Sequence, residues 1–197
     1  METMKGIPDR VRKKIKNNSG MTVFELLCAV LILLLVSSGM ASAVSLGVRQ
    51  YQKSIRDSES KVLYSTLMTV LSNELAYTTD IRVDAVDVSG KRNVLQFQSQ
   101  NYVIEGNLST LMTDESGDYG YGQILLGNSK DTSESMRVLG KAAYANGLLA
   151  KVTSITYDNS NFCFSVYLSI GYQGTECYGG EFQVQNVNRT PAVVLEE

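Results

Sequence analysis

Histidine is absent from the chain of 197 residues. This absence removes the commonest general base and the commonest zinc ligand, and the serine and acidic residues form no catalytic triad without it. We therefore predict that the protein is not an enzyme and has no cofactor or metal. Asp114, Glu115 and Asp118 could bind calcium, but their spacing does not match an EF-hand loop, and a solvated acidic loop is the preferred interpretation.

Charge is missing from one long segment and unevenly spread elsewhere. Leu26–Val48 contains no charged residue and, as a helix, would span roughly 34 Å, enough to cross a bilayer. Residues 1–20 carry six Lys/Arg against Glu2 and Asp9, which predicts that the N-terminus stays in the cytoplasm. The remainder carries twelve Lys/Arg against eighteen Asp/Glu, so we expect no direct nucleic-acid binding.

Proline and glycine are missing between Arg49 and Tyr77, and helical spacing of apolar residues persists there. We predict one helix from near Met21 to about Tyr77. It would follow a basic leader (1–20) and consist of a transmembrane, assembly half (21–48) and an amphipathic half (49–79). The small residues Ser37–Gly39 are a possible weak point.

Residues 80–197 show short alternating runs separated by turn residues, which is typical of strands. The predicted architecture is α+β, a long helix packed on the antiparallel β-sheet of an extracytoplasmic head. Hairpins are expected at Ser89-Gly90 and Asp158-Asn159-Ser160, and a loop at Ser116–Gly122. The expected strands are Ile81–Val88, Asn93–Gln98, Tyr102–Glu105, Gln123–Leu126, Lys151–Tyr157, Phe162–Ile170 and Glu181–Val187.

The junction between the leader and the apolar run carries the most specific motif. The leader ends at Gly20, and a single carboxylate, Glu25, stands at the fifth position after it. This segment resembles the type IV pilin superfamily, including the pseudopilins of type II secretion and of competence systems. The residues that match the superfamily signature are Gly20, Thr22, Glu25, Leu26 and Leu27.

Two positions depart from the family pattern. Met21 stands where an aromatic residue is usual, a departure that minor members of the family often tolerate. Ser42 replaces the proline that many major pilins carry further along the helix. The resemblance covers about the first 60 residues.

The resemblance implies a processing and assembly pathway. A prepilin peptidase would cut after Gly20, the amine of Met21 would be methylated, and an assembly platform would move the subunit into a filament with other pilin or pseudopilin subunits. The chain would be a single-pass protein of the inner or cytoplasmic membrane with its head outside, and later part of a cell-surface or periplasmic filament.

Glu25 supports this interpretation physically. A carboxylate in a membrane helix costs about 2.5–3.5 kcal/mol, so a partner is expected. The new amine of Met21, in the same or a neighbouring subunit, would neutralise it, and a charge pair between subunits would set their axial register.

Two simpler interpretations remain open. Leu26–Val36 followed by cleavage after Ala43 would be an ordinary secretory signal, and an uncleaved anchor is the other possibility. Either would make the protein a conventionally secreted or membrane-anchored binding or adhesion module. Neither interpretation gives Glu25 a role.

Three cysteines complete the set of candidate residues. Cys28 lies in the apolar run and is read as a small apolar residue. Cys163 and Cys177 fall in the exported part, where disulfides persist, and the Gly-rich connection Gly171–Gly180 would return the chain toward Cys163. We therefore predict a disulfide between Cys163 and Cys177.

Overall fold

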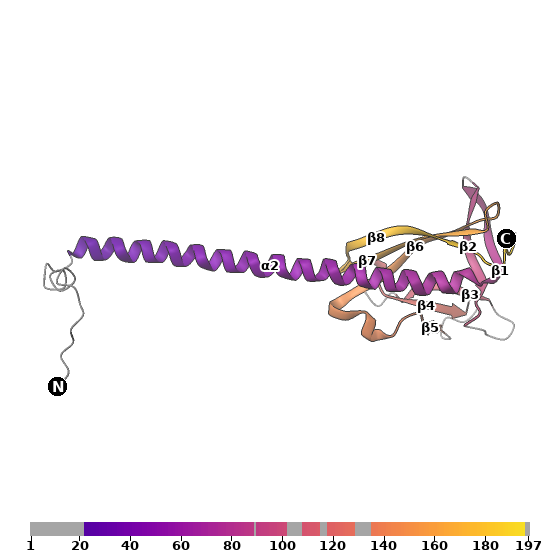
Figure 1. The fold of residues 1–197 in the computed structure, drawn as a ribbon, viewed down its shortest axis with the longest axis horizontal. Helices are drawn as coiled ribbons and strands as arrows, with labels where there is room; N and C mark the ends of the chain where they lie inside the picture. Colours follow the sequence, from indigo (N-terminus) through magenta and orange to yellow (C-terminus); the bar gives the residue numbers. More distant parts are fainter. Residues whose placement is uncertain (1–21, 89, 102–107, 115–117, 129–134, 196–197) are drawn as a thin grey trace, which may run out of the picture. The chain divides into compact units, whose positions relative to one another are not determined.

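In the described part of the chain, one long helix is followed by a sheet of nine strands. The helix α2 (Val23–Ala76, 54 residues) is unbroken, also at Ser37–Gly39, and its bounds are close to the predicted ones. The chain divides into two compact units, Met1–Tyr51 and Gln52–Glu197, and α2 contributes to both. The computed structural model describes residues 22–88, 90–101, 108–114, 118–128 and 135–195 (Figure 1).

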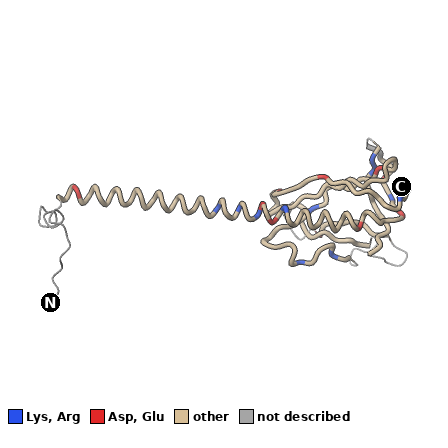
Figure 2. Tube along the Cα trace, viewed as in Figure 1, with Lys and Arg blue, Asp and Glu red and all other residues tan. Residues whose placement is uncertain are grey.

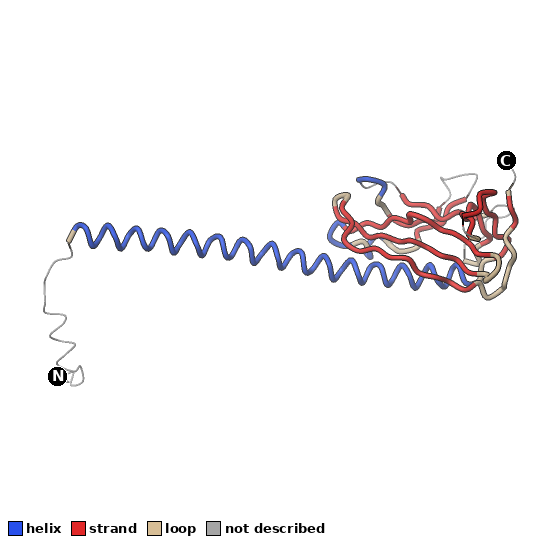
Figure 3. The backbone as a smooth tube through the Cα atoms, turned by 90° about the horizontal axis from the view of Figure 1, so that it is seen from above, coloured by secondary structure: helices blue, strands red, loops and turns tan. Residues whose placement is uncertain are grey.

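The second unit contains all the strands, which confirms the predicted α+β class. In it, α2 packs against two limbs of the sheet, one formed by β6, β7 and β8 and one formed by β3, β4 and β5, which appear on either side of it in Figure 1; Figure 3 shows strands alongside the same stretch of the helix. The strands are β1 (Thr79–Val88), β2 (Lys91–Gln98), β3 (Ser109–Asp114), β4 (Gln123–Asn128), β5 (Ser135–Arg137), β6 (Leu148–Asp158), β7 (Cys163–Tyr172), β8 (Thr175–Gln185) and β9 (Val193–Val194).

The sheet follows the order β5-β4-β3-β2-β6-β7-β8, and β1 pairs with both β2 and β9. Every pairing is antiparallel except the short one between β1 and β9. The sheet divides at β2, because β6 pairs with Arg92 and Asn93 near its start and β3 pairs with Phe97 near its end.

The two predicted hairpins are confirmed. Val88 pairs with Lys91 across the first turn, where Gly90 has a φ of 82°, and Asp158 pairs with Cys163 across the second. The first turn needs a left-handed residue, which glycine adopts without strain. The predicted strand Tyr102–Glu105 lies outside the described residues. The sequence did not reveal β3, β5 or β9.

The Gly-rich connection was predicted wrongly, because most of it belongs to a strand. The actual turn is only Gln173-Gly174, both with positive φ, and β8 begins at Thr175 and ends at Gln185 instead of spanning Glu181–Val187. Gly180 fits the strand because a side chain there would crowd the α2 residue Tyr64: a Cβ would lie 3.1 Å from the Tyr64 hydroxyl.

The predicted disulfide is wrong for the same reason. Both cysteines are free, and Cys163 pairs with Gln185, whereas Cys177 lies eight residues away from Gln185 along β8. Eight residues of strand span about 26 Å. A disulfide needs Cα atoms about 4.4–6.8 Å apart. The paired strands β7 and β8 therefore hold the two thiols at opposite ends of their hairpin.

The core lies between the second-unit part of α2 and both limbs of the sheet. The buried face of α2 consists of Ser60, Leu63, Leu67, Leu71, Glu74 and Leu75, in agreement with the predicted amphipathic pattern. The largest buried side chains of the strands are Ile81, Phe97, Ile124, Leu126, Leu148, Tyr157, Phe164, Leu168 and Ile170. Aliphatic residues at spacings of three and four put one continuous stripe of the helix against the sheet.

The C-terminal end of α2 is completed by residues far away in sequence. The fully buried Asn186 donates from its side-chain amide to the carbonyls of Leu75 and Thr78, and the Val187 N–H donates to the Ala76 carbonyl at 2.7 Å. The last carbonyls of a helix have no partner within it. The segment after β8 supplies these partners.

Candidate functional site: the apolar half of the helix

In the first unit, the structure describes only the helix α2, whose residues form no core there. Its large apolar side chains are exposed on every side: Val23 is 82% exposed, Leu33 66% and Val44 67%. Figure 2 shows no charged residue between Glu25 and Arg49. A helix that is apolar on all sides is stable in a bilayer or inside a larger assembly, not in water. In the described part of the chain, α2 is long and apolar enough to cross a membrane.

Glu25 and Thr22 form a capping box at the start of α2. The Thr22 N–H donates to a Glu25 carboxylate oxygen at 3.0 Å, and the Glu25 N–H donates to the Thr22 hydroxyl at 3.2 Å. The Thr22 hydroxyl also lies 3.1 Å from the same carboxylate oxygen. In a capping box, two N–H groups that the helix leaves unpaired are satisfied reciprocally, and the negative charge faces the positive end of the helix dipole.

This capping box gives Glu25 a role in all three interpretations of the segment. The expectation that a plain anchor or a secretory signal gives Glu25 no role is therefore wrong, because the carboxylate caps the helix in either case. The signal was readable in the sequence as Thr22-x-x-Glu25.

A strip of small residues lies further along the same half. Gly39, Ala43 and Gly47 are spaced by four and share one face of the helix. A Cβ added at Gly39 or Gly47 would meet nothing within 4 Å, so no packing inside the described chain requires glycine there. Strips of this kind let another membrane helix approach closely.

The other predicted site residues are not brought together. Gly20 and Met21, the predicted cleavage site and mature N-terminus, lie outside the described residues, as does Glu115 of the acidic loop. Cys28 is half-buried in the apolar half. Within the described residues, no three His, Cys, Asp or Glu side chains form a group that could hold a metal ion.

Comparisons with family models, curated proteins and solved structures find no match to this chain. The long N-terminal apolar helix packed on an antiparallel sheet is compatible with a pilin-like fold.

Proposed function

We propose that this protein is a membrane-anchored structural subunit, a minor pilin or pseudopilin, of a filament that serves secretion, competence or a type IV pilus. One observation carries the proposal. A single helix is uncharged from Leu26 to Val48, where its large apolar side chains are exposed, and then amphipathic and packed under a β-rich head. Such a helix needs two environments. The head covers the amphipathic half, whereas the exposed half needs a membrane or other subunits around it.

The exposed half has the properties of an assembly helix. It can reside in the membrane as a single-pass anchor, and in a filament the same apolar surface would pack against the helices of other subunits. The strip at Gly39, Ala43 and Gly47 favours close helix contact. The partners in this proposal are the membrane, other pilin-like subunits, a prepilin peptidase and an assembly platform.

Glu25 would act twice in this pathway. Before cleavage it caps the helix through Thr22. Cleavage after Gly20 would place a positive amine on Met21, one residue before Thr22 and four before Glu25. That amine, or the amine of a neighbouring subunit, would neutralise a carboxylate that is costly in an apolar environment.

The N-terminus of the mature protein tests the proposal most directly. Mass spectrometry of the protein from its native membrane should find a chain that begins at Met21 with a methylated amine. A chain that begins at Val44 would identify an ordinary secretory signal, and an intact Met1 would identify an uncleaved anchor. Both results would contradict processing after Gly20, and Gly20→Leu should block that processing if the proposal is correct.

The membrane orientation needs its own test. The basic cluster before the apolar run should hold the N-terminus in the cytoplasm. A reporter that is active only in the cytoplasm, fused after Glu197, should then be silent, whereas the same reporter fused before Met1 should be active. The reverse pattern would refute the orientation.

A further inference from the structure

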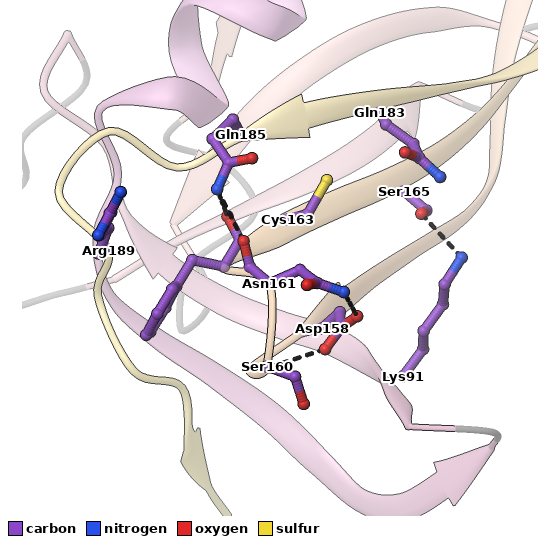
Figure 4. A pocket seen from close by; sticks show the side chains of 10 residues that line it. Lys91, Asp158, Ser160, Asn161, Cys163, Ser165, Gln183, Gln185 and Arg189 are labelled. Carbon is purple, nitrogen blue, oxygen red and sulfur yellow. Dashed lines mark hydrogen bonds between the residues drawn. The ribbon is translucent and has the colours of Figure 1, made fainter.

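A polar cavity opens on the second unit where the β6–β7 hairpin meets the ends of β2 and β8. Its volume is about 630 Å³. This lies within the range of about 300–1,000 Å³ that is usual for small-molecule sites. The cavity lies wholly within the second unit, so its chemistry does not depend on how the N-terminus is processed (Figure 4).

The lining mixes charges of both signs. Lys91 and Arg189 lie at opposite ends of the cavity, and Asn161 and Cys163 lie between them (Figure 4). Asp158 also lines it, and Glu181 is 3.7 Å from the Lys91 ammonium group. Two positive charges are thus balanced by two negative ones. The cavity therefore has little net charge with which to attract an anionic ligand such as phosphate.

Hydrogen bonds hold the polar groups in place but do not use all of their donor and acceptor positions. Asp158 accepts bonds of 2.8 Å from the Ser160 N–H and from the Asn161 side-chain amide, and these bonds, led by the one from Ser160, hold the pKa of its carboxyl below the ordinary value. The Gln185 amide nitrogen donates to the Asn161 carbonyl at 2.7 Å. A carboxylate has about four acceptor positions and an amide has two donors and two acceptor positions, so these groups can bind a ligand as well.

Two further side chains, those of Gln183 and Lys91, have hydrogen-bonding groups left for a ligand. Gln183 is exposed on β8, and within the described residues it has no hydrogen-bond partner. Lys91 donates to the Ser165 hydroxyl at 3.0 Å, which leaves two of its three donors. The cavity therefore presents donors and acceptors side by side.

We infer that this cavity binds a short neutral saccharide. Each sugar hydroxyl donates and accepts at once, which suits a lining that interleaves ammonium, guanidinium, amide and carboxylate groups. A ligand that only accepts hydrogen bonds would leave the remaining acceptor positions of Asp158 unused, and one that only donates would leave the remaining donors of Lys91 and Arg189 unused. Phe162 adds an aromatic ring to the lining, against which the apolar face of a sugar ring can pack.

Two of the three free thiols provide a direct test with an internal control. Cys163 lines the cavity and Cys177 does not. The full-length chain in phosphatidylcholine nanodiscs, free of maltoside detergents because their head groups are sugars, is alkylated with N-ethylmaleimide. Chitotriose, cellotriose, mannotriose or galactotriose is added, and tri-galacturonate, inorganic phosphate and triglycine serve as comparison probes.

At least one neutral trisaccharide should slow the alkylation of Cys163 and leave that of Cys177 unchanged. Protection follows the bound fraction, so it should reach about tenfold when the sugar concentration is ten times its Kd. Added sodium chloride should not weaken the protection, since a neutral ligand makes no charge pair that salt can screen.

Gln183→Ala should weaken binding of that trisaccharide by about fivefold, the usual effect of losing one hydrogen bond. Gln52→Ala, which removes an exposed glutamine far from the cavity in sequence, should not change it. Asp158 is a poor choice for mutation because its carboxylate holds the hairpin turn.

The inference is overturned if no neutral trisaccharide protects Cys163, or if tri-galacturonate, phosphate or triglycine protects it better than every neutral sugar. Equal binding by Gln183→Ala and the unchanged chain would also contradict it. None of these outcomes bears on cleavage after Gly20, so the saccharide site and the proposed function fail or succeed separately.

Discussion

The two halves of α2 form the same secondary structure in opposite surroundings. Leu33 in the first unit is 66% exposed, whereas Leu67 in the second is fully buried. The first half is apolar all round and has none of the described residues packed over it, and the second is apolar along one stripe that the sheet covers. Hydrophobicity alone thus does not decide burial, because a helix that is apolar on every side needs a bilayer or other subunits as its solvent.

The sharpest test of this comparison is a matched pair of leucine truncations on one helix. Leu71→Ala should lower the free energy of unfolding of the head by about 2–5 kcal/mol, because it leaves a cavity in a closed core. Leu33→Ala should leave head stability unchanged. Denaturant unfolding in nanodiscs, followed by tyrosine fluorescence since the chain has eleven Tyr and no Trp, measures both. Equal losses would mean that the two units unfold as one.

A smaller effect is expected where the helix ends. Asn186→Ala should cost about 1–3 kcal/mol, because it removes the buried amide that pairs with the carbonyls of Leu75 and Thr78. Asn188→Ala is the control: the exposed Asn188 amide donates to the Tyr77 carbonyl at 3.0 Å, where water can replace it. Similar losses in both variants would show that burial of the cap is unimportant.

At the other end of the helix, charge and capping at Glu25 can be separated. Glu25→Gln keeps an acceptor for the Thr22 N–H, so the helix start should be retained, whereas Glu25→Val should lose about 1 kcal/mol of local helix stability. Both variants should still enter the membrane. If the charge pairs with an amine in the filament, both should be poorly incorporated, as judged by fractionating membranes and sheared filaments. Normal incorporation of Glu25→Gln would reduce the role of Glu25 to capping.

The last effect concerns alkaline pH and the head alone. Burial raises the pKa of Tyr157 to about 12, and its hydroxyl donates to the Thr190 carbonyl at 2.7 Å. The unfolded chain releases this proton near pH 10 and the folded chain only near pH 12, so this contribution to stability is complete below pH 10 and is lost as pH rises through that window.

Tyr157→Phe should therefore remove that part of the alkaline pH dependence. At neutral pH it should cost about 0.5–1.5 kcal/mol through the lost hydrogen bond. Unfolding curves at several pH values measure both quantities. An unchanged alkaline slope in the variant would assign the effect to another tyrosine.

Sequence reasoning succeeded where neighbouring residues decide the structure. The uncharged run and the lack of proline predicted α2, and turn residues predicted the hairpins at Gly90 and Asp158. It failed at β8, where Gly179 and Gly180 suggested a loop. Glycine weakens a strand unless something approaches closely, and here Tyr64 of α2 does, which local sequence does not reveal.

The candidate site divides in the same way. Thr22 and Glu25 are three residues apart, so their capping motif can be recognised in the sequence, although the capping role was not predicted. The polar cavity joins Lys91 of β2 to Gln183 of β8 and Arg189 beyond it, residues about ninety or more positions apart. No spacing pattern in the sequence predicts that residues so far apart lie together.

The sequence by itself determined the long helix, its uncharged membrane-length half and the hairpin turns at Gly90 and Asp158, because each depends on interactions between residues a few positions apart. The tertiary structure alone decided the register of β8, the separation of Cys163 from Cys177 and the capping of α2 by Asn186, which is 111 residues from Leu75. These features depend on which distant surfaces meet once the core closes. Buried backbone groups must then find partners wherever the fold has placed them.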